Sequence, residues 1–271
     1  MAELCEPDKT EGEFLEIADG DGSLMRMRIL PREEGEASAH YVSRLLYYNI
    51  MMLIILPGTR LHEGRIAEGL GISKTPVHQA VGRLEQMLMV SVKPQSATRV
   101  TRISFDLVRQ SVFMRLAVES RVCSQVAACL SADEAVLLRD NIARQKSASN
   151  VYDFISLDND FHRIVYSIAK KDYVWLELRQ GSAHFDRLRY MGLIKGYDTA
   201  KPEEHETLLN MLEFNGMTGT SETAEFEGFL RRHLCHFSEY LNRLILEYPE
   251  YFDISNARVT SDTLQRVAWL L

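Results

Sequence analysis

The chain has 271 residues, of which 46% are apolar and 25% charged, and this composition is typical of a water-soluble protein with one large or two medium domains. Its longest apolar stretch, Leu45–Leu56, contains Asn49 and is shorter than the ~20 residues of a membrane-spanning helix. The first fifteen residues are acidic, unlike a secretion signal. The four cysteines have no C-x-x-C spacing, which argues against a disulfide framework or zinc knuckle. These features predict a cytoplasmic protein with no membrane partner.

The formal net charge of −7 is spread unevenly along the chain. Residues 1–37 contain 4 basic and 11 acidic side chains, whereas residues 38–104 contain 8 basic and 3 acidic ones. Residues 105–271 are acidic again, with 19 basic and 24 acidic side chains. A basic module therefore lies between an acidic tail and an acidic body. This pattern, which the whole-chain pI of 5.7 hides, favours a nucleic-acid partner for the middle segment.

The first 37 residues have four glycines, many acids and only scattered apolar positions. This composition predicts a mostly disordered extension over 1–37, within which Ser23–Leu30 is the stretch best suited to dock on a folded surface.

Residues 38–104 have the pattern of a small DNA-binding module. Apolar periodicity predicts three helices, near residues 39–56, 62–70 and 75–87. Pro57-Gly58 and Gly71 mark the turns between them, and Thr75-Pro76 marks the start of the third helix, with Thr75 as its cap. Two β-rich runs around a polar tip predict a hairpin formed by Met89–Lys93 and Arg99–Ile103. Three helices followed by a hairpin predict a winged helix-turn-helix.

From residue 105 onward helical periodicity continues, β-rich runs are absent, and Pro202 and Pro249 are the only prolines. The candidate helices cover residues 106–130, 132–146, 151–169, 173–194, 202–215 and 219–247. They predict an all-α effector-binding and dimerisation domain over 105–248, with a C-terminal tail over 249–271. The expected fold is therefore mainly α, an N-terminal winged helix-turn-helix followed by an all-α helical bundle.

A long motif runs through the DNA-binding module. Its members, in order, are Pro57-Gly58, Leu61, Ile66-Ala67, Leu70-Gly71-Ile72-Ser73, Thr75-Pro76-Val77, Ala80 and Arg83-Leu84-Glu85. This pattern resembles the N-terminal domain of the GntR family of bacterial transcription regulators. The resemblance implies that the third helix and the hairpin contact double-stranded DNA, through Ser73, Lys74, Thr75, His78, Arg83 and Arg99.

The residues of the third helix support the same conclusion independently. One face is apolar and suits the domain core, which leaves Lys74, His78 and Arg83 for phosphates or base edges. The same side chains would also suit an ordinary solvated helix surface. The family usually has arginine at the positions of Lys74 and His78, and arginine contacts guanine with a two-pronged fork that lysine and histidine lack. DNA binding is therefore expected, while the operator sequence stays open.

A candidate metal site is spread along the helical body. Asp158 and His162 are four residues apart, so they share one face of a helix. His205 and His233 lie on two later helices, and one carboxylate with three imidazoles can bind a divalent cation inside a bundle. Because the chain has 8 histidines, such spacings arise easily by chance. Spacing alone leaves a metal centre and a polar core cluster as alternatives.

The same residues fit a known domain. The matching positions are Arg115 with Glu119, Asp158 with Phe161 and His162, Glu204-His205, and His233-Leu234. This set resembles the FCD effector domain of the FadR branch of GntR regulators. The resemblance implies a divalent metal ion, zinc first and nickel, iron or manganese as alternatives, held by Asp158, His162, His205 and His233. It also implies an effector-facing Arg115. Arg187 or Arg189 would add a cationic contact unless they lie on a solvated helix face.

Together these features predict a metabolite-responsive transcription regulator, with a repressor favoured and an activator as the alternative. It would bind an inverted-repeat DNA operator as a homodimer and respond to a small organic or sugar acid that completes the coordination of the metal. A regulator that senses acyl-CoA is one alternative. An all-α metal-dependent enzyme is a weaker one, because an enzyme does not need a basic winged helix, and the sequence shows no nucleophile or paired carboxylate beside the histidines.

Overall fold

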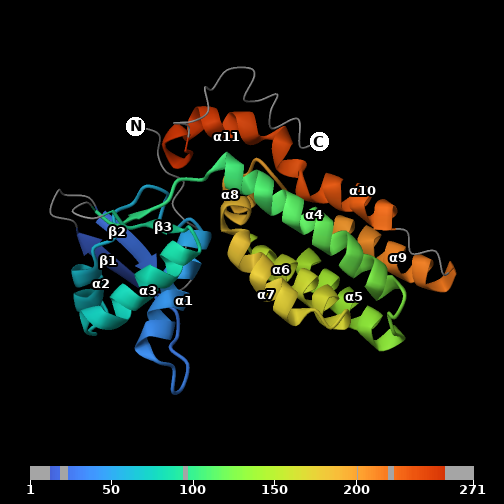
Figure 1. The fold of residues 1–271 in the computed structure, drawn as a ribbon, viewed down its shortest axis with the longest axis horizontal. Coiled ribbons are helices and arrows are strands. Elements are labelled where there is room, and N and C mark those ends of the chain that lie inside the picture. The colour runs from blue at the N-terminus through green and yellow to red at the C-terminus, as the bar shows by residue number, and fades with distance from the viewer. Residues whose placement is uncertain (1–12, 19–23, 94–96, 200, 219–222, 254–271) are drawn as a thin grey trace. The chain divides into compact units, whose positions relative to one another are not determined.

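The computed structural model describes residues 13–18, 24–93, 97–199, 201–218 and 223–253. The chain forms two compact units, drawn in Figure 1. The DNA-binding unit contains the chain up to Ser104 together with a segment that starts at Ile245, and the helical unit contains Phe105 to Leu244. Among the helices of the described residues, none is long and apolar enough to cross a membrane.

The DNA-binding unit contains the winged helix-turn-helix expected from the sequence. Its elements are α1 (Ser38–Met51), α2 (Glu63–Gly69), α3 (Lys74–Gln86), β3 (Val90–Ser91) and β4 (Arg99–Val100). The two wing strands are antiparallel, with Val90 opposite Val100, and residues 94–96 of the predicted tip lie outside the described part. Because α3 packs against α1 and α2 through its apolar face, its polar face remains exposed.

The start of α3 differs from the prediction. Ser73 is the N-cap residue and Lys74 the first helical residue, so the expectation that Thr75 caps this helix is wrong. Pro76 then occupies the third helical position, where its missing N–H is still one of the four that have no partner within a helix. The proline therefore permits the earlier start.

The predicted disorder of residues 1–37 is wrong for the part that the structure describes. Strands β1 (Phe14–Ala18) and β2 (Leu24–Arg28) form an antiparallel hairpin that packs on α2 and α1. Met27 is fully buried, and Asn49 of α1 binds the β2 backbone: its Oδ1 accepts from Arg28 N at 2.6 Å and its Nδ2 donates to Arg28 O at 2.9 Å. Apolar residues alternate along β2 and bury one face of the strand. The acidic composition of the segment made this strand pattern hard to see in the sequence. Residues 1–12 and 19–23 lie outside the described part.

The first residues of the predicted C-terminal tail also belong to the DNA-binding unit. Ile103 N donates to Tyr251 O at 2.8 Å, and Asp253 N donates to Ile103 O at 2.9 Å. Phe252 is fully buried beside this pairing. Residues 249–253 are therefore integral to the unit, and residues 254–271 lie outside the described part.

The helical unit is built from α-helices, as predicted. They are α4 (Phe105–Ala127), α5 (Ala132–Lys146), α6 (Val151–Ile168), α7 (Asp172–Gly181), α8 (Ala183–Ile194), α9 (Pro202–Thr218) and α10 (Thr223–Leu234). The chain continues through η1 (His236–Glu239), α11 (Leu241–Glu247) and η2 (Pro249–Tyr251). Helix α4 contacts α6, α8, α9 and α10 (Figure 1).

Two predicted helices are divided in the structure. The segment 173–194 breaks at Ser182 into α7 and α8, and the segment 219–247 breaks into α10, η1 and α11. Gly181, a poor helix former, is the last residue of α7, and Ser182 follows it with φ −100° and ψ 1°, outside the helical region. Apolar periodicity does not reveal such a break, because the helices on both sides bury apolar faces.

Candidate functional site

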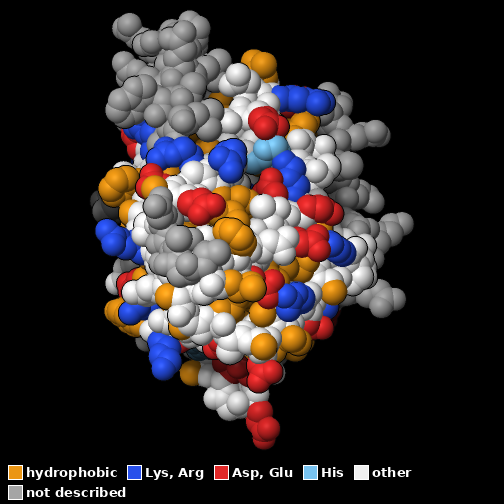
Figure 2. All heavy atoms as spheres, turned by 90° about the vertical axis from the view of Figure 1, so that its right-hand side faces the viewer, with side chains coloured by type: hydrophobic (Ala, Val, Ile, Leu, Met, Phe, Trp, Pro, Cys, Tyr) orange, Lys and Arg blue, Asp and Glu red, His pale blue; other side chains and the backbone are white. Residues whose placement is uncertain are grey.

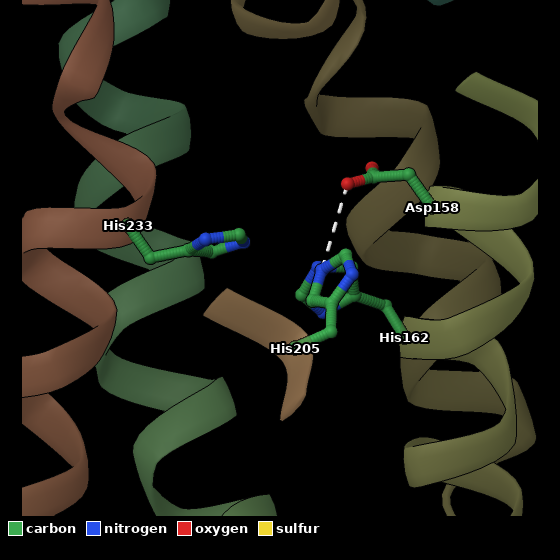
Figure 3. Close-up of side chains that lie close together, drawn as sticks. All are labelled: Asp158, His162, His205 and His233. Atoms are coloured by element: carbon green, nitrogen blue, oxygen red, sulfur yellow. Dashed lines mark ion pairs between the residues drawn. The ribbon is translucent and has the colours of Figure 1, made fainter. Parts of the chain in front are cut away.

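The four predicted metal ligands meet inside the helical unit. Asp158 and His162 come from α6, His205 from α9 and His233 from α10, as Figure 3 shows. Each offers one ligand atom, and these atoms all lie within 4.8 Å of one another. All four side chains are buried, and His205 is only 1% exposed. Four polar groups have therefore been brought together from three helices in a site that excludes bulk water.

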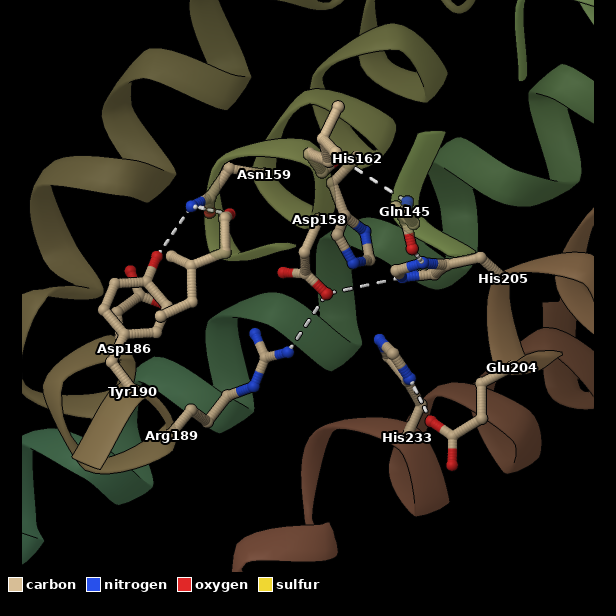
Figure 4. Close-up of polar contacts among 12 residues, drawn as sticks. Gln145, Asp158, Asn159, His162, Asp186, Arg189, Tyr190, Glu204, His205 and His233 are labelled. Atoms are coloured by element: carbon tan, nitrogen blue, oxygen red, sulfur yellow. Dashed lines mark hydrogen bonds and ion pairs between the residues drawn. The ribbon is translucent and has the colours of Figure 1, made fainter. Parts of the chain in front are cut away.

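Two of the imidazoles are held by their outer nitrogens (Figure 4). His205 Nδ1 donates to Gln145 Oε1 at 2.7 Å, and His233 Nδ1 donates to Glu204 Oε2 at 2.5 Å. His162 Nδ1 lies 3.7 Å from a carboxylate oxygen of Glu119. The three Nε2 atoms are buried with no hydrogen-bond partner. Because the outer partners of His205 and His233 are acceptors, their protons sit on Nδ1 and their Nε2 lone pairs point into the cluster.

Gln145 is itself fixed in one orientation. Its Nε2 donates to Asn141 Oδ1 at 2.6 Å, which turns its Oε1 toward His205. A relay from Asn141 through Gln145 thus selects the tautomer of His205. Hydrogen bonds of this kind orient metal-binding histidines and raise their basicity.

Burial and charge set the protonation states that a metal requires. Burial lowers the pKa of His205 to about 3, although Asp158 opposes the change, and it holds the pKa of His162 well below its usual value. For Asp158 burial raises the pKa, but the positive charges of Arg189 and Arg115 oppose this effect, and its pKa is lowered. Neutral imidazoles and an ionised carboxylate are the ligand forms that bind divalent metals. The cluster can therefore hold such an ion.

Arg115 and Arg187 are buried, and the Arg189 side chain is only 13% exposed, so the alternative of a solvated helix face for Arg187 and Arg189 is wrong. Arg189 Nη2 lies 3.4 Å from Asp158 Oδ1, at the edge of the cluster. Arg115 forms a buried ion pair with Glu119, with 2.6 Å between Nε and Oε1. Arg187 instead lies against His184, and burial lowers its pKa to about 10. The structure thus places Arg115 and Arg189 beside the metal ligands and Arg187 in a different environment.

The predicted DNA contacts lie on the exposed side of the winged helix. Five of them are exposed on or immediately before α3, namely Ser73, Lys74, Thr75, His78 and Arg83. Arg99 is exposed on the wing, where its Nη1 donates to Gly58 O at 3.0 Å. His78 lies 3.1 Å from a carboxylate oxygen of Glu63, so part of its hydrogen-bonding capacity is already used.

Comparisons with known proteins agree with this architecture. Residues 39–100 match the family model described as bacterial regulatory proteins, gntR family, and residues 110–216 match that of the FCD domain. The chain belongs to the GntR family. It is 27% identical over 214 residues to the HTH-type transcriptional repressor RspR of Escherichia coli, a match that covers 78% of this chain and 92% of the relative. An uncharacterized HTH-type regulator of Streptomyces ambofaciens is 29% identical over 214 residues, or 78% of this chain and 87% of the relative.

A solved structure shows the same fold as this GntR-family regulator. E. coli McbR/YncC superposes with a TM-score of 0.61 at 19% identity, over 76% of this chain and 100% of that one. The family consists of transcription regulators, which are not enzymes, so the chain is a DNA-binding transcription regulator.

A small cavity of about 30 Å³ adjoins the metal ligands in the GntR-family regulator, bordered by Asp158, Arg189 and His233. A larger surface pocket of about 590 Å³ lies next to it, and both are lined by Phe154, Leu193 and Asp198. The inner cavity has room for one or two water molecules. A larger ligand reaches the cluster only if side chains such as Phe154 and Leu193 move.

Sequence reasoning missed the residues that orient the histidines. Gln145 lies 60 positions from His205, and no local spacing connects the two. Glu204 precedes His205 in the chain yet serves His233, which only the folded structure reveals. The sequence offered one signal for Gln145: it is a polar residue at a position of the predicted helix that faces the core.

Proposed function

We propose that this GntR-family regulator is a repressor that binds an inverted-repeat operator as a homodimer and responds to a small organic or sugar acid through a divalent metal ion. The observation that carries the proposal is the buried cluster in which three Nε2 lone pairs and one ionised carboxylate converge. Such groups repel one another unless a cation lies among them.

The donor set suits a metal of borderline character. Three imidazoles and one carboxylate favour zinc, with nickel, iron or manganese as alternatives, and geometry and availability decide among them. A metal bound by Asp158, His162, His205 and His233 would supply a Lewis-acidic anchor for a carboxylate ligand. The chain itself contributes the hydrogen bonds that orient His205 and His233 and a buried surrounding.

An anionic effector is supported by the two arginines at the cluster. A guanidinium carries five N–H donors, and the 3.4 Å contact of Arg189 with Asp158 involves one nitrogen only. The guanidinium groups of Arg115 and Arg189 both lie near the Phe185 ring, 5.3 and 5.6 Å from its centroid. Both can turn N–H groups toward a small acid. Because the inner cavity is only about 30 Å³, even a small acid requires neighbouring side chains to move before it reaches the cluster.

The helix that carries Arg115 follows directly from the DNA-binding unit along the chain. Arg115 lies on α4, which begins at Phe105, immediately after the wing segment that ends at Ser104. A ligand that binds more tightly to one arrangement of α4 would shift the population of DNA-binding states by that difference in affinity. The name of the relative RspR, a transcriptional repressor, supports repression as the outcome.

Elemental analysis of protein purified without chelators tests the metal. We expect near-stoichiometric metal in the wild type and in His40→Ala, whose side chain is 62% exposed in the DNA-binding unit, and loss of the metal in His205→Ala. A wild type without metal that also gains no thermal stability from added zinc would reduce the site to a polar core cluster.

A thermal-shift screen of organic and sugar acids tests the effector. The shift given by an active acid should disappear after chelation and in Arg115→Ala. An acid whose shift survives both changes contradicts the mechanism, and a long-chain acyl-CoA as the sole active compound favours the alternative regulator.

A further inference from the structure

The exposed face of α3 has the composition of a surface that meets nucleic acid. Residues 73–83 are all described by the structure, and their exposed members include no acidic and no apolar side chain. These members are Ser73, Lys74, Thr75, His78, Gln79 and Arg83. By contrast, the face of the molecule drawn in Figure 2 carries apolar, acidic and basic side chains interspersed, the ordinary pattern of a protein surface. A face without acids is suited to approach the phosphates of DNA.

Gln79 lies near the middle of this face. Successive residues of an α-helix are rotated by about 100°, so Thr75 and Gly82 lie opposite the buried side of α3. By the same rotation Gln79 lies about 40° from Thr75, whereas Lys74 and Arg83 lie roughly 80–100° from it, toward the two borders. In a helix-turn-helix the residues in the N-terminal part of this helix contact base edges in the major groove. Gln79 is therefore at a position from which a side chain reaches a base.

The helix surface beside Gln79 is open. Gly82 follows it by three residues, and a Cβ at Gly82 would meet no atom within 4 Å, so packing within the unit does not require a glycine there. Glycine weakens a helix interior, and it occurs where a backbone comes close to a ligand. The glycine thus allows α3 to lie deep in a groove, within reach of a side chain as short as glutamine.

Two other polar side chains of α3 are drawn toward α2. The Lys74 stem runs along Gly64, where a Cβ would lie 2.9 Å from Lys74 Cε. His78 Nδ1 lies 3.1 Å from a carboxylate oxygen of Glu63. Gln79, in contrast, has no side-chain hydrogen bond to any described residue. Its amide oxygen and its amide nitrogen are therefore both available to a ligand.

A glutamine amide has the donor and acceptor pattern that matches one base. It places an acceptor and a donor side by side, and adenine presents the complementary pair in the major groove, the N6 amino donor and the N7 acceptor. Guanine presents two acceptors there, and cytosine presents an amino donor without a neighbouring acceptor. Adenine is therefore the base to which a glutamine can form two hydrogen bonds at once.

We infer that Gln79 reads an adenine in each half of the operator, with Oε1 accepting from adenine N6 and Nε2 donating to N7. The inference rests on the operator binding of the proposed function and deepens it by naming a base and the residue that selects it. Gln79 carries no charge, so the charge pattern that identified Lys74, His78 and Arg83 did not identify it.

Selection of duplexes from a random-sequence library by the full-length chain, at one fixed salt concentration, tests the assignment. Gln79→Glu has a matched control in Gln86→Glu, because both glutamines are exposed on α3 and both changes add one negative charge. We expect Gln79→Glu to select cytosine where the wild type selects adenine, since a carboxylate accepts from the cytosine amino group. Gln86→Glu should select the wild-type sequence. Circular dichroism verifies that each variant keeps its helices.

A second variant and a modified base measure the contact itself. In Gln79→Ala the preference for adenine at that position should fall from roughly 10-fold or more to within about twofold. Replacing the adenine with 7-deazaadenine removes the N7 acceptor, so the affinity of the wild type should fall roughly 3–10-fold and that of Gln79→Ala should stay unchanged.

The outcomes separate the inference from the proposed function. A Gln79→Ala chain that selects the wild-type base at every position overturns the inference, as does a 7-deazaadenine loss of equal size in the wild type and in Gln79→Ala. If the selected duplexes carry a single half-site, the proposed two-fold operator fails, while cytosine selected by Gln79→Glu still supports the role of Gln79.

Discussion

Replacing Gln145 with leucine tests whether the tautomer of His205 is selected from outside the cluster. Gln145 is 3% exposed, and its amide accepts from His205 Nδ1 and donates to Asn141 Oδ1. Leucine removes both hydrogen bonds without touching a ligand atom, so the imidazole can rotate and place its proton on Nε2. Loss of such an orienting residue typically lowers metal affinity 10–100-fold, or about 1.4–2.7 kcal/mol.

The same substitution also affects the metal-free fold. It leaves the buried Nδ1–H of His205 and the Oδ1 of Asn141 without a partner, at a cost of about 1–3 kcal/mol each in the free energy of unfolding. Competition for zinc with a chromogenic chelator measures the affinity, and urea unfolding of metal-free protein measures the stability. Gln125→Leu on the exposed side of α4 serves as the control, with neither quantity changed. A zinc affinity in Gln145→Leu within twofold of the wild type would refute the orienting role.

Three further predictions concern the DNA-binding unit. Arg83→Ala should weaken binding to a duplex selected from random sequence by about 1–3 kcal/mol and relax specificity at one position, whereas an equal loss on every sequence would indicate a phosphate contact. Asn49→Leu should lower the free energy of unfolding by about 1–3 kcal/mol, since Arg28 N and O lose their side-chain partner; unchanged urea unfolding would show that the hairpin adds no stability. The Arg44 hydrogen bonds lower the pKa of Glu36 from 4.5 to about 2. The stability that ionised Glu36 gives to the folded state is therefore full above pH 4.5 and is lost as the pH falls toward 2. An NMR titration of Glu36 with a midpoint near 4.5 would contradict this.

Local signals in the sequence predict the helices well where those signals are complete. Helix α5 occupies the predicted residues 132–146, because Ser131 and Glu134 form a capping box at its start and Lys146 precedes its end. The break after Gly181 was missed, since the helices on both sides bury apolar faces and their periodicity carries across it. A boundary without a complete capping signal is the hardest to predict.

The candidate site divides along a similar line. Motifs and family resemblance identified Asp158, His162, His205 and His233 as one group, and the fold brings their ligand atoms together. The residue that orients His205 was not identified, because its contact is tertiary and has no motif. The N-terminal hairpin was missed for the same reason: its anchor, Asn49, lies in another element, 21 positions from Arg28.

The pairing of Ile103 with Tyr251 and Asp253 makes the DNA-binding unit a discontinuous domain, into which the helical unit is inserted. A chain cut after Ser104 would retain the three helices and the wing yet lack Phe252, which is fully buried in the intact unit. The N–H and C=O of Ile103 would lose their partners at the same time. Isolation of the DNA-reading half as a stable fragment therefore requires the residues around Phe252 to be rejoined to it, for example by a short linker in place of the inserted unit.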